Sequence, residues 1–426
     1  MESRKFETHC VQSGYTPDSS TLAAVAPIYR TSSYIFKNTE HAANLFALKE
    51  LGYIYTRLNN PTCSVLEERM AAIEGGKAAV AISSGTSAIF YSVINICKAG
   101  DHIVSSDALY GGTYTMFNDI LPSLGIKTTF VDINNEQAVC AAITANTKML
   151  FCETIGNPLL DVSNIKQLAA IGRAQNLPLV VDNTFATPYI FKPLEHGANV
   201  VVESLTKWIG GHGAGIGGVV IDGANFNWAQ EKFPAFNEPD SSYHGLRYAH
   251  DLGDMCPIAF ALRLRLVPLR NLGACLSPDN AWLFLQGIET LALRMQRQSE
   301  NALKVARHLS QHKKVSWIRY PGLPTDPGYA VGHEQFGENY GGMVVFGIKG
   351  GKAAGSAFID ALKLFLHLAN VGDTRSLAIH PATTTHSQLT TEQQKQCRIG
   401  EDLVRLSIGL EHIDDIIADI DQALGK

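Results

Sequence analysis

The residue best placed for covalent chemistry is Lys207. It follows an apolar run that ends at Ser204, and the glycine-rich segment Gly210 to Gly218 comes shortly after it. Glycines let the backbone approach a ligand closely. A lysine amine attacks a carbonyl near neutral pH only when its surroundings desolvate it or depress its pKa, and a position just past a buried strand meets this condition. The pattern indicates a lysine that forms a Schiff base with an aldehyde.

Asp182 supplies a carboxylate in a matching position. It ends the run Leu179 to Asp182, 25 residues before Lys207. In a parallel sheet both side chains would project from the carboxyl edge, where open α/β sheets bind ligands. A carboxylate there can keep a pyridine nitrogen protonated, so that the ring withdraws electrons while the lysine holds the aldehyde. Taken alone, Asp182 also fits a helix N-cap or a surface charge.

Groups suited to a phosphate occur in the same pattern. Ser83 to Ser87, which includes Ser84, Gly85 and Thr86, follows the run Ala78 to Ile82 and precedes an apolar helical segment. This order places backbone N–H groups at a helix N-terminus, where a dianion binds well. Ser204 and Thr206 add hydroxyls beside Lys207, and Tyr110 offers a ring for stacking on a planar cofactor. An ordinary helix cap and a half-buried core tyrosine are the structural alternatives.

Other classes of site fit less well. Gly213, Gly215 and Gly218 have dinucleotide-fingerprint spacing, but they precede the run Val219 to Ile221 instead of following a strand and opening a helix. His308 and His312 are not part of a His-Glu-x-x-His motif, so we expect no metal site. Lys and Arg total 35 against 40 Asp and Glu, with no basic stripe, which argues against nucleic acid as the main partner.

The elements that must position these groups follow an α/β pattern. Short β-branched apolar runs alternate with amphipathic segments from about residue 78 to 221, which predicts a mainly parallel sheet of seven strands covered by helices. Ser163 to Gln175 is one predicted helix, with a Ser cap. After residue 273 we expect an α+β region with a long helix over Asn280 to Leu309, a helix over Ala353 to Leu366 and a strand over Leu403 to Ser407. The predicted organisation is an arm over residues 1–62, a large domain over 63–272 and a smaller domain over 273–426.

Length and composition agree with a globular enzyme. The chain has 426 residues, of which 46% are hydrophobic and 18% charged, enough for two or three domains with a cleft. The first residues lack the apolar stretch of a secretory signal, and no apolar run is long enough to span a membrane. The eight cysteines form no Cys-x-x-Cys pair. We therefore expect free thiols and a cytoplasmic protein.

The segments together resemble the Cys/Met-metabolism family of pyridoxal-phosphate enzymes, which share the aspartate-aminotransferase-like fold. The resemblance keeps the family's order over nearly the whole chain. It rests on Tyr55-x-Arg57, Ser84-Gly85-Thr86-Ser87-Ala88, Tyr110-Gly-Gly-Thr113, Glu153-Thr-Ile-Gly-Asn157-Pro158, Asp182-Asn183-Thr184, Ser204-Leu-Thr-Lys207 and Val404-Arg405-Leu-Ser-Ile-Gly409.

The resemblance implies a role for each matched residue. Lys207 would hold pyridoxal 5'-phosphate as a Schiff base and carry protons, and Tyr110 would stack on the ring and serve as an acid or base. The remaining roles are as follows: Asp182 pairs with the pyridinium, Gly85, Thr86, Ser84, Ser204 and Thr206 bind phosphate, Tyr55 and Arg57 reach the neighbouring subunit's phosphate, Asn157 meets the phenolic oxygen, and Arg405 binds the substrate's α-carboxylate. A fixed ion pair with a protein carboxylate is the alternative for Arg405.

Within the family, three segments resemble the branch that transfers sulfide to O-acetylhomoserine: the arm before Tyr53, the insertion Phe233 to Asn280, and Asn370, where other branches carry Ser. The implied enzyme is a transferase of methionine biosynthesis that forms homocysteine and acetate, or methionine from methanethiol. A cystathionine γ-synthase or γ-lyase is one alternative, and a non-catalytic cofactor-binding protein is another. The family also implies a homotetramer, and His380 and His386 flank a loop expected to border the site.

Overall fold

The computed structural model describes residues 4–384 and 400–425, and its centre is a seven-stranded sheet. Strand β7 is antiparallel to both neighbours and the other pairings are parallel, so the predicted mainly parallel sheet is confirmed. The strands lie side by side in the order β1 (Ala78–Ile82), β7 (Gly218–Asp222), β6 (Val200–Ser204), β5 (Leu179–Asp182), β4 (Thr147–Glu153), β2 (His102–Ser106) and β3 (Lys127–Val131).

Both faces of this sheet are covered by helices. Alternate residues of β1 belong to different cores: Ala79 and Ala81 face one, and Val80 and Ile82 face the other. This is the burial expected of a strand with helices on both sides. The α-helices of this part of the chain are α3 (Pro61–Glu74), α4 (Gly85–Ile96), α5 (Gly111–Thr115), α6 (Leu121–Ser123), α7 (Glu136–Ala142), α8 (Ile165–Gln175), α9 (Thr187–Ile190), α10 (Pro234–Asn237), α11 (Ala259–Leu264) and α12 (Arg270–Leu272).

A second sheet follows in the C-terminal part of the chain, which confirms the predicted α+β region. Its strand Leu403–Ser407 was predicted with the observed bounds. The strands lie in the order β10 (Leu366–His367), β11 (Leu377–Ile379), β12 (Leu403–Ser407), β9 (Met343–Ile348) and β8 (Val315–Arg319), with helices α15 (Tyr329–Phe336), α16 (Gly351–Ala361) and α18 (Ile413–Gly425). The division at residues 62 and 272 stays a prediction.

Two predicted helix ends were wrong. Asn164, not Ser163, caps α8, because the Ser163 hydroxyl donates to the Glu153 carbonyl instead. Helix α16 ends at Ala361 rather than Leu366, and the carboxylate of Asp419 accepts the backbone N–H groups of the next residues, 363–365.

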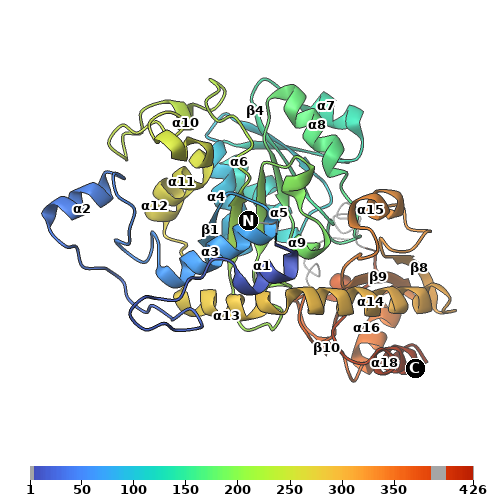
Figure 1. Cartoon of the computed structure of the whole chain (residues 1–426). Helices are drawn as coiled ribbons and strands as arrows, with labels where there is room; N and C mark the ends of the chain where they lie inside the picture. Colours follow the sequence, from blue (N-terminus) through green and yellow to red (C-terminus); the bar gives the residue numbers. More distant parts are fainter. Residues whose placement is uncertain (1–3, 385–399, 426) are drawn as a thin grey trace.

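The predicted long helix over Asn280 to Leu309 is two helices, α13 (Pro278–Glu289) and α14 (Leu291–Ser310). They meet at Thr290, whose φ of −109° and ψ of 7° leave the helical region. Figure 1 shows the pair lying end to end, from beneath the large sheet to the C-terminal sheet. Helix α13 packs on α3, and α14 packs on β8, β9 and α18. The pair therefore connects the two sheets.

The N-terminal segment before α3 begins with a helix that packs on the body and continues into a projecting segment that contains α2. Helix α1 (Phe6–Gln12) packs on α3 and α13, whereas α2 (Thr39–Phe46) extends away from the body (Figure 1). Apolar side chains of the projecting segment are strongly exposed, with Ile35 98% and Leu51 71% accessible. Exposed apolar side chains in such a cluster indicate a surface that another molecule covers.

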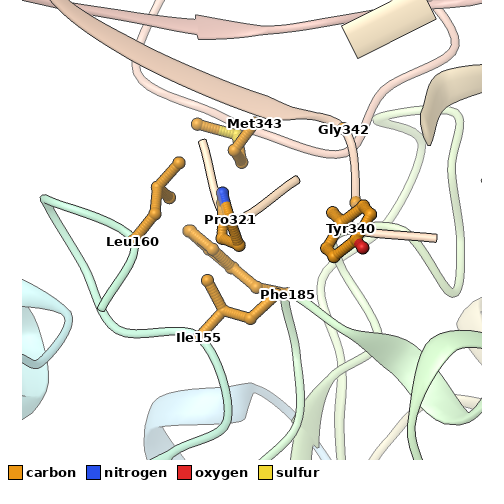
Figure 2. Close-up of a pocket in the computed structure, with 8 residues that line it drawn as sticks. Ile155, Leu160, Phe185, Pro321, Tyr340, Gly342 and Met343 are labelled. Carbon is orange, nitrogen blue, oxygen red and sulfur yellow. The ribbon is translucent and has the colours of Figure 1, made fainter. Parts of the chain in front are cut away.

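An apolar junction joins the two halves of the molecule near the carboxyl ends of β4 and β5. Figure 2 shows Ile155, Leu160 and Phe185 directed toward Pro321, Tyr340 and Met343 from the C-terminal region. The gap between them is too small for a water molecule. The loops after β4 and β5 are thus packed against the C-terminal region.

The helices in the described parts of the chain include none that is both long and apolar enough to cross a membrane.

Candidate active site

Lys207 lies in the turn that follows β6, and its amine faces the C-terminal region. Its Nζ donates a 2.6 Å hydrogen bond to Oδ1 of Asn370. Burial, with a further contribution from the positive charge of Arg405, lowers the pKa of Lys207 to about 8. An amine with this pKa is half neutral near pH 8, and its neutral form can act as a nucleophile or a base.

Asp182 ends β5, the strand next to β6, and lies beside Val202 in register. Its Oδ1 accepts the backbone N–H of Thr184 at 2.9 Å. Desolvation raises the pKa of Asp182 above its usual value, although the hydrogen bonds from Thr184 oppose the shift. Among the described residues no cation forms an ion pair with Asp182. A bound positive group would therefore be favoured at this carboxylate.

The N-terminus of α4 meets the end of β6. Ser84 caps the helix, since its hydroxyl accepts the N–H of Ser87 at 3.1 Å. Gly85 is required here, because a Cβ at this position would lie 2.6 Å from Cβ of Ser204. The structure therefore brings Ser84, Gly85, Thr86 and Ser204 together. Thr206 is engaged differently: its hydroxyl donates to the carbonyl of Gly217 and accepts the N–H of the same residue.

Tyr110 stands at the start of α5 with 52% of its surface exposed. Its backbone N–H donates a 2.6 Å hydrogen bond to Oε1 of Glu153. Glu153 ends β4 next to Asp182 in register, and burial together with the charge of Asp182 raises its pKa well above the usual value. We assigned Glu153 no role from the sequence, although its position at the end of a predicted strand was a sufficient signal.

Arg405 approaches the site from β12, the strand between β11 and β9. Its Nη1 donates to Oδ1 of Asn157 at 3.2 Å, which joins the C-terminal sheet to the loop after β4. Burial lowers the pKa of Arg405 to about 10, and Tyr110 partly opposes this shift. No acid of residues 4–384 or 400–425 forms an ion pair with it. The ion pair considered as an alternative is thus not seen, and a substrate carboxylate would supply the missing anion.

Tyr55 and Arg57 lie in the N-terminal projecting segment, between α2 and α3. The Arg57 guanidinium stacks 5.3 Å from the centre of the Tyr55 ring and donates to the carbonyl of Arg270. No hydrogen bond between described residues joins either one to Lys207 or Asp182 of the same chain.

His380, His308 and His312 contact residues other than Lys207 and Asp182. His380 is buried, and its ring nitrogens contact the Glu401 carbonyl and the Thr383 hydroxyl. His386 lies outside the described residues. His308 contacts a carboxylate oxygen of Asp421 at 2.6 Å, and His312 lies next to it.

A buried pair of carboxyl groups, Glu74 and Glu203, lies beneath the carboxyl edge of the sheet. Both residues are 0% exposed, and three of their four carboxyl oxygens lack a hydrogen-bond donor in the described parts of the chain. Asn183 donates to the fourth, Oε1 of Glu74, at 2.8 Å. Burial and mutual repulsion raise the pKa of Glu203, and burial raises that of Glu74 to about 7. The two groups must share at least one proton, because two buried acceptors cannot otherwise pair.

This pair makes stability depend on pH. Since the folded pKa values are raised, the pair's contribution is fully present below about pH 4.3, the usual carboxyl pKa, and is lost as pH rises toward about 7. We expect Glu203→Gln to raise Tm by about 2 °C or more at pH 8, because the amide can donate to Glu74. The gain should shrink at pH 5. Thermal unfolding at both pH values tests this, and a variant less stable than the parent at pH 8 would contradict the shared proton.

Known proteins resemble this chain over nearly its whole length. A family model described as Cys/Met metabolism PLP-dependent enzyme matches residues 7–425. The O-acetyl-L-homoserine sulfhydrylase of Leptospira meyeri is 50% identical over 426 residues, 99% of this chain and 96% of that protein. The homocysteine synthase of Schizosaccharomyces pombe is 46% identical, covering 100% of this chain and 99% of its own.

A solved structure resembles the whole chain. It is that of a putative O-acetylhomoserine (thiol)-lyase from Campylobacter jejuni, with a TM-score of 0.95 and 38% identity over 99% of this chain and 100% of that one. That crystal structure contains a lysine linked to pyridoxyl phosphate.

Proposed function

The chain belongs to the Cys/Met metabolism family of pyridoxal-phosphate-dependent enzymes, and we propose that it replaces the acetate of O-acetyl-L-homoserine by sulfide. The products are L-homocysteine and acetate, so the enzyme is a transferase of methionine biosynthesis. The observation that carries this proposal is the arrangement around Lys207. A desolvated amine, the Arg405 guanidinium, which has no ion pair within the described ranges, and the carboxylate of Asp182 come from different elements to the same edge of the large sheet.

The residues present fit pyridoxal phosphate. Asp182 is a desolvated carboxylate without a cation among the described ion pairs, which suits a protonated pyridine nitrogen. The helix N-terminus at the start of α4 and the Ser204 hydroxyl beside it suit a phosphate. When bound, the cofactor supplies an electron-withdrawing ring that makes the carbons next to the substrate amine acidic.

The chain's own residues would then do the following. Lys207 would hold the cofactor aldehyde and would move protons at the substrate's Cα and Cβ. Arg405 binds the α-carboxylate in a charge-assisted pair, while Asn370 holds Nζ of Lys207. Acetate leaves from Cγ, and the sulfur of sulfide forms the new bond at that carbon. Tyr110 would stack on the cofactor, and Asn157, which accepts a hydrogen bond from Arg405, would meet the cofactor's phenolic oxygen.

A product assay tests the substrate assignment. Purified protein with pyridoxal phosphate receives O-acetylhomoserine with sulfide, with cysteine or with neither, and products are identified by mass spectrometry. Homocysteine formed mainly with sulfide supports the proposal, and methionine formed from methanethiol would extend it. Cystathionine as the main product, or 2-oxobutyrate formed without a thiol, would move the enzyme to the synthase or lyase branch.

The lowered pKa of Lys207 predicts how the protein takes up its cofactor. Only the neutral amine attacks the aldehyde, so the rate of condensation with pyridoxal phosphate should rise with pH, with a midpoint near pH 8. Stopped-flow absorbance of the cofactor measures this rate. An Arg405→Leu variant should shift the midpoint to higher pH, because one of the two causes of the lowered pKa is removed. A midpoint near the usual lysine pKa of about 10.4 would contradict the buried amine.

We propose that the chain works as a homo-oligomer, a tetramer built from active dimers. Support comes from the exposed apolar side chains of the projecting segment, and from Tyr55 and Arg57, which lie in it without a contact to their own Lys207 in the described hydrogen bonds. These two residues would complete the phosphate site of the neighbouring subunit. Light scattering that shows fully active monomers would refute the proposal.

We further propose a cytoplasmic location. The seven cysteines within the described ranges are all free thiols, which suits a reducing compartment.

A further inference from the structure

Arg294 is a buried cation with an unusual set of partners. It lies in the first turn of α14 and is 4% exposed. Within residues 4–384 and 400–425 no carboxylate forms an ion pair with it. Burying a guanidinium without an anion costs free energy unless its N–H groups are hydrogen-bonded. The acceptors of these hydrogen bonds therefore indicate what Arg294 does.

Those hydrogen bonds go to the backbone just after Lys207. Nη1 donates to the Trp208 carbonyl at 2.6 Å and Nη2 to the Ile209 carbonyl at 3.1 Å. Nη2 also donates to the Gly287 carbonyl at 2.6 Å, near the end of α13, and Nε donates to the Thr290 hydroxyl at 3.2 Å. One side chain thus ties the lysine-bearing turn to the break between α13 and α14.

Two glycines leave room for this guanidinium and the backbone it binds. Gly211 has a φ of +72°, and a Cβ there would lie 2.1 Å from Nη1 of Arg294. Gly287 has no Cβ, which would otherwise lie 2.6 Å from the Ile209 carbonyl oxygen. Both close approaches require glycine.

The turn is held from its other side by the loop that carries Asn370. The N–H of Thr374 donates to the Gly211 carbonyl at 2.8 Å, and Gln298 of α14 donates to the Asp373 carbonyl at 2.7 Å. The backbone of Lys207 therefore lies between two elements of the C-terminal region, and Arg294 provides its connection to α14.

We propose that Arg294 is a positioning residue for Lys207: by binding the Trp208 and Ile209 carbonyls it fixes where the catalytic amine stands. It acts through the backbone and touches neither substrate nor cofactor. This inference rests on the proposed function, because it assumes that Lys207 is the reacting amine. Lysine cannot replace arginine here, since one ammonium cannot reproduce the planar set of donors that spans several carbonyls.

The test compares Arg294→Lys with Arg263→Lys. Arg263 is a matched control, because it is also a partly buried guanidinium that binds backbone carbonyls, those of Ala235 in the insertion and Asn95 in α4. We expect Arg294→Lys to slow the condensation of pyridoxal phosphate with the apoprotein by at least about tenfold and to lower kcat by about 100-fold. Arg263→Lys should lower Tm but leave both rates unchanged.

An Arg294→Lys variant that loses only thermal stability, as the control does, would overturn the proposal. If Arg294→Lys does not fold, Thr290→Val decides, because it removes one acceptor of the guanidinium and keeps the arginine. A two- to fivefold slower condensation would then support the proposal, and an unchanged rate would refute it. Condensation needs no substrate, so a wrong substrate assignment leaves this test valid. A parent protein that forms no Schiff base would instead refute the proposed function.

Discussion

Lys207→Ala protein should bind pyridoxal phosphate only noncovalently and lose at least about 10³-fold in kcat. The methyl group of alanine can neither hold the aldehyde nor carry a proton to or from the substrate. Asn370, which accepts a 2.6 Å hydrogen bond from Lys207, cannot replace it, because an amide is not a base. Steady-state kinetics and the absorbance of the bound cofactor measure the two effects.

Lys148→Ala is the matched control for this variant. Lys148 is also a partly buried lysine, with an ion pair of 3.7 Å to Asp101, but it lies near the start of β4, at the opposite edge of the sheet. We expect its removal to lower Tm while kcat stays close to that of the parent. Near-normal turnover by Lys207→Ala would remove the assignment of Lys207.

Asp182→Asn should lower kcat by about 10²- to 10³-fold. The amide oxygen keeps the hydrogen bond from the Thr184 N–H, so the local fold should persist. A neutral amide, however, cannot stabilise a proton on the pyridine nitrogen, and the ring then withdraws electrons less effectively. The pH dependence of the cofactor absorbance should change together with kcat.

Asp222→Asn separates this charge effect from the loss of any buried carboxylate. Asp222 is 2% exposed and accepts the N–H groups of Ala224 and Ala261, and burial raises its pKa to about 6. It pairs with Val200 at the start of β6, on the edge of the sheet opposite Asp182. Its kcat should be unchanged, whereas an Asp182→Asn variant within about threefold of the parent would contradict the electron-sink role.

The sequence allowed the large sheet and one edge of the site to be predicted, for a physical reason. Parallel strands read as continuous β-branched runs, and residues at their carboxyl ends must meet at one edge. This rule placed Asp182 and Lys207 correctly relative to the sheet. It applies equally to Glu153, which we did not assign.

The contacts between the two halves of the chain could not be predicted in the same way. Asn370 lies 163 residues from Lys207, and Asn157 lies 248 residues from Arg405. No local periodicity encodes pairs at such separations, since tertiary packing brings them together. The same is true of the buried pair Glu74 and Glu203.

Local propensity also failed where a side chain competes for the backbone at a helix end. The sequence over Asn280 to Leu309 reads as one helix, but Arg294 binds the Gly287 carbonyl next to the break at Thr290. Asp419 likewise binds the backbone where a helix was expected to continue to Leu366. Asp419 comes from outside the window in which a helix is predicted, whereas Arg294 lies inside its window and binds the backbone of the preceding helix.

Running the reaction with O-acetylhomoserine and sulfide in deuterium oxide shows whether Lys207 moves protons on the substrate. If Lys207 moves protons at the substrate's Cα and Cβ, the homocysteine formed should carry deuterium at both carbons, as measured by NMR and mass spectrometry. Homocysteine that keeps its original hydrogens at both positions would show direct displacement of acetate at Cγ. That result would contradict the role of Lys207 and with it the account of this site.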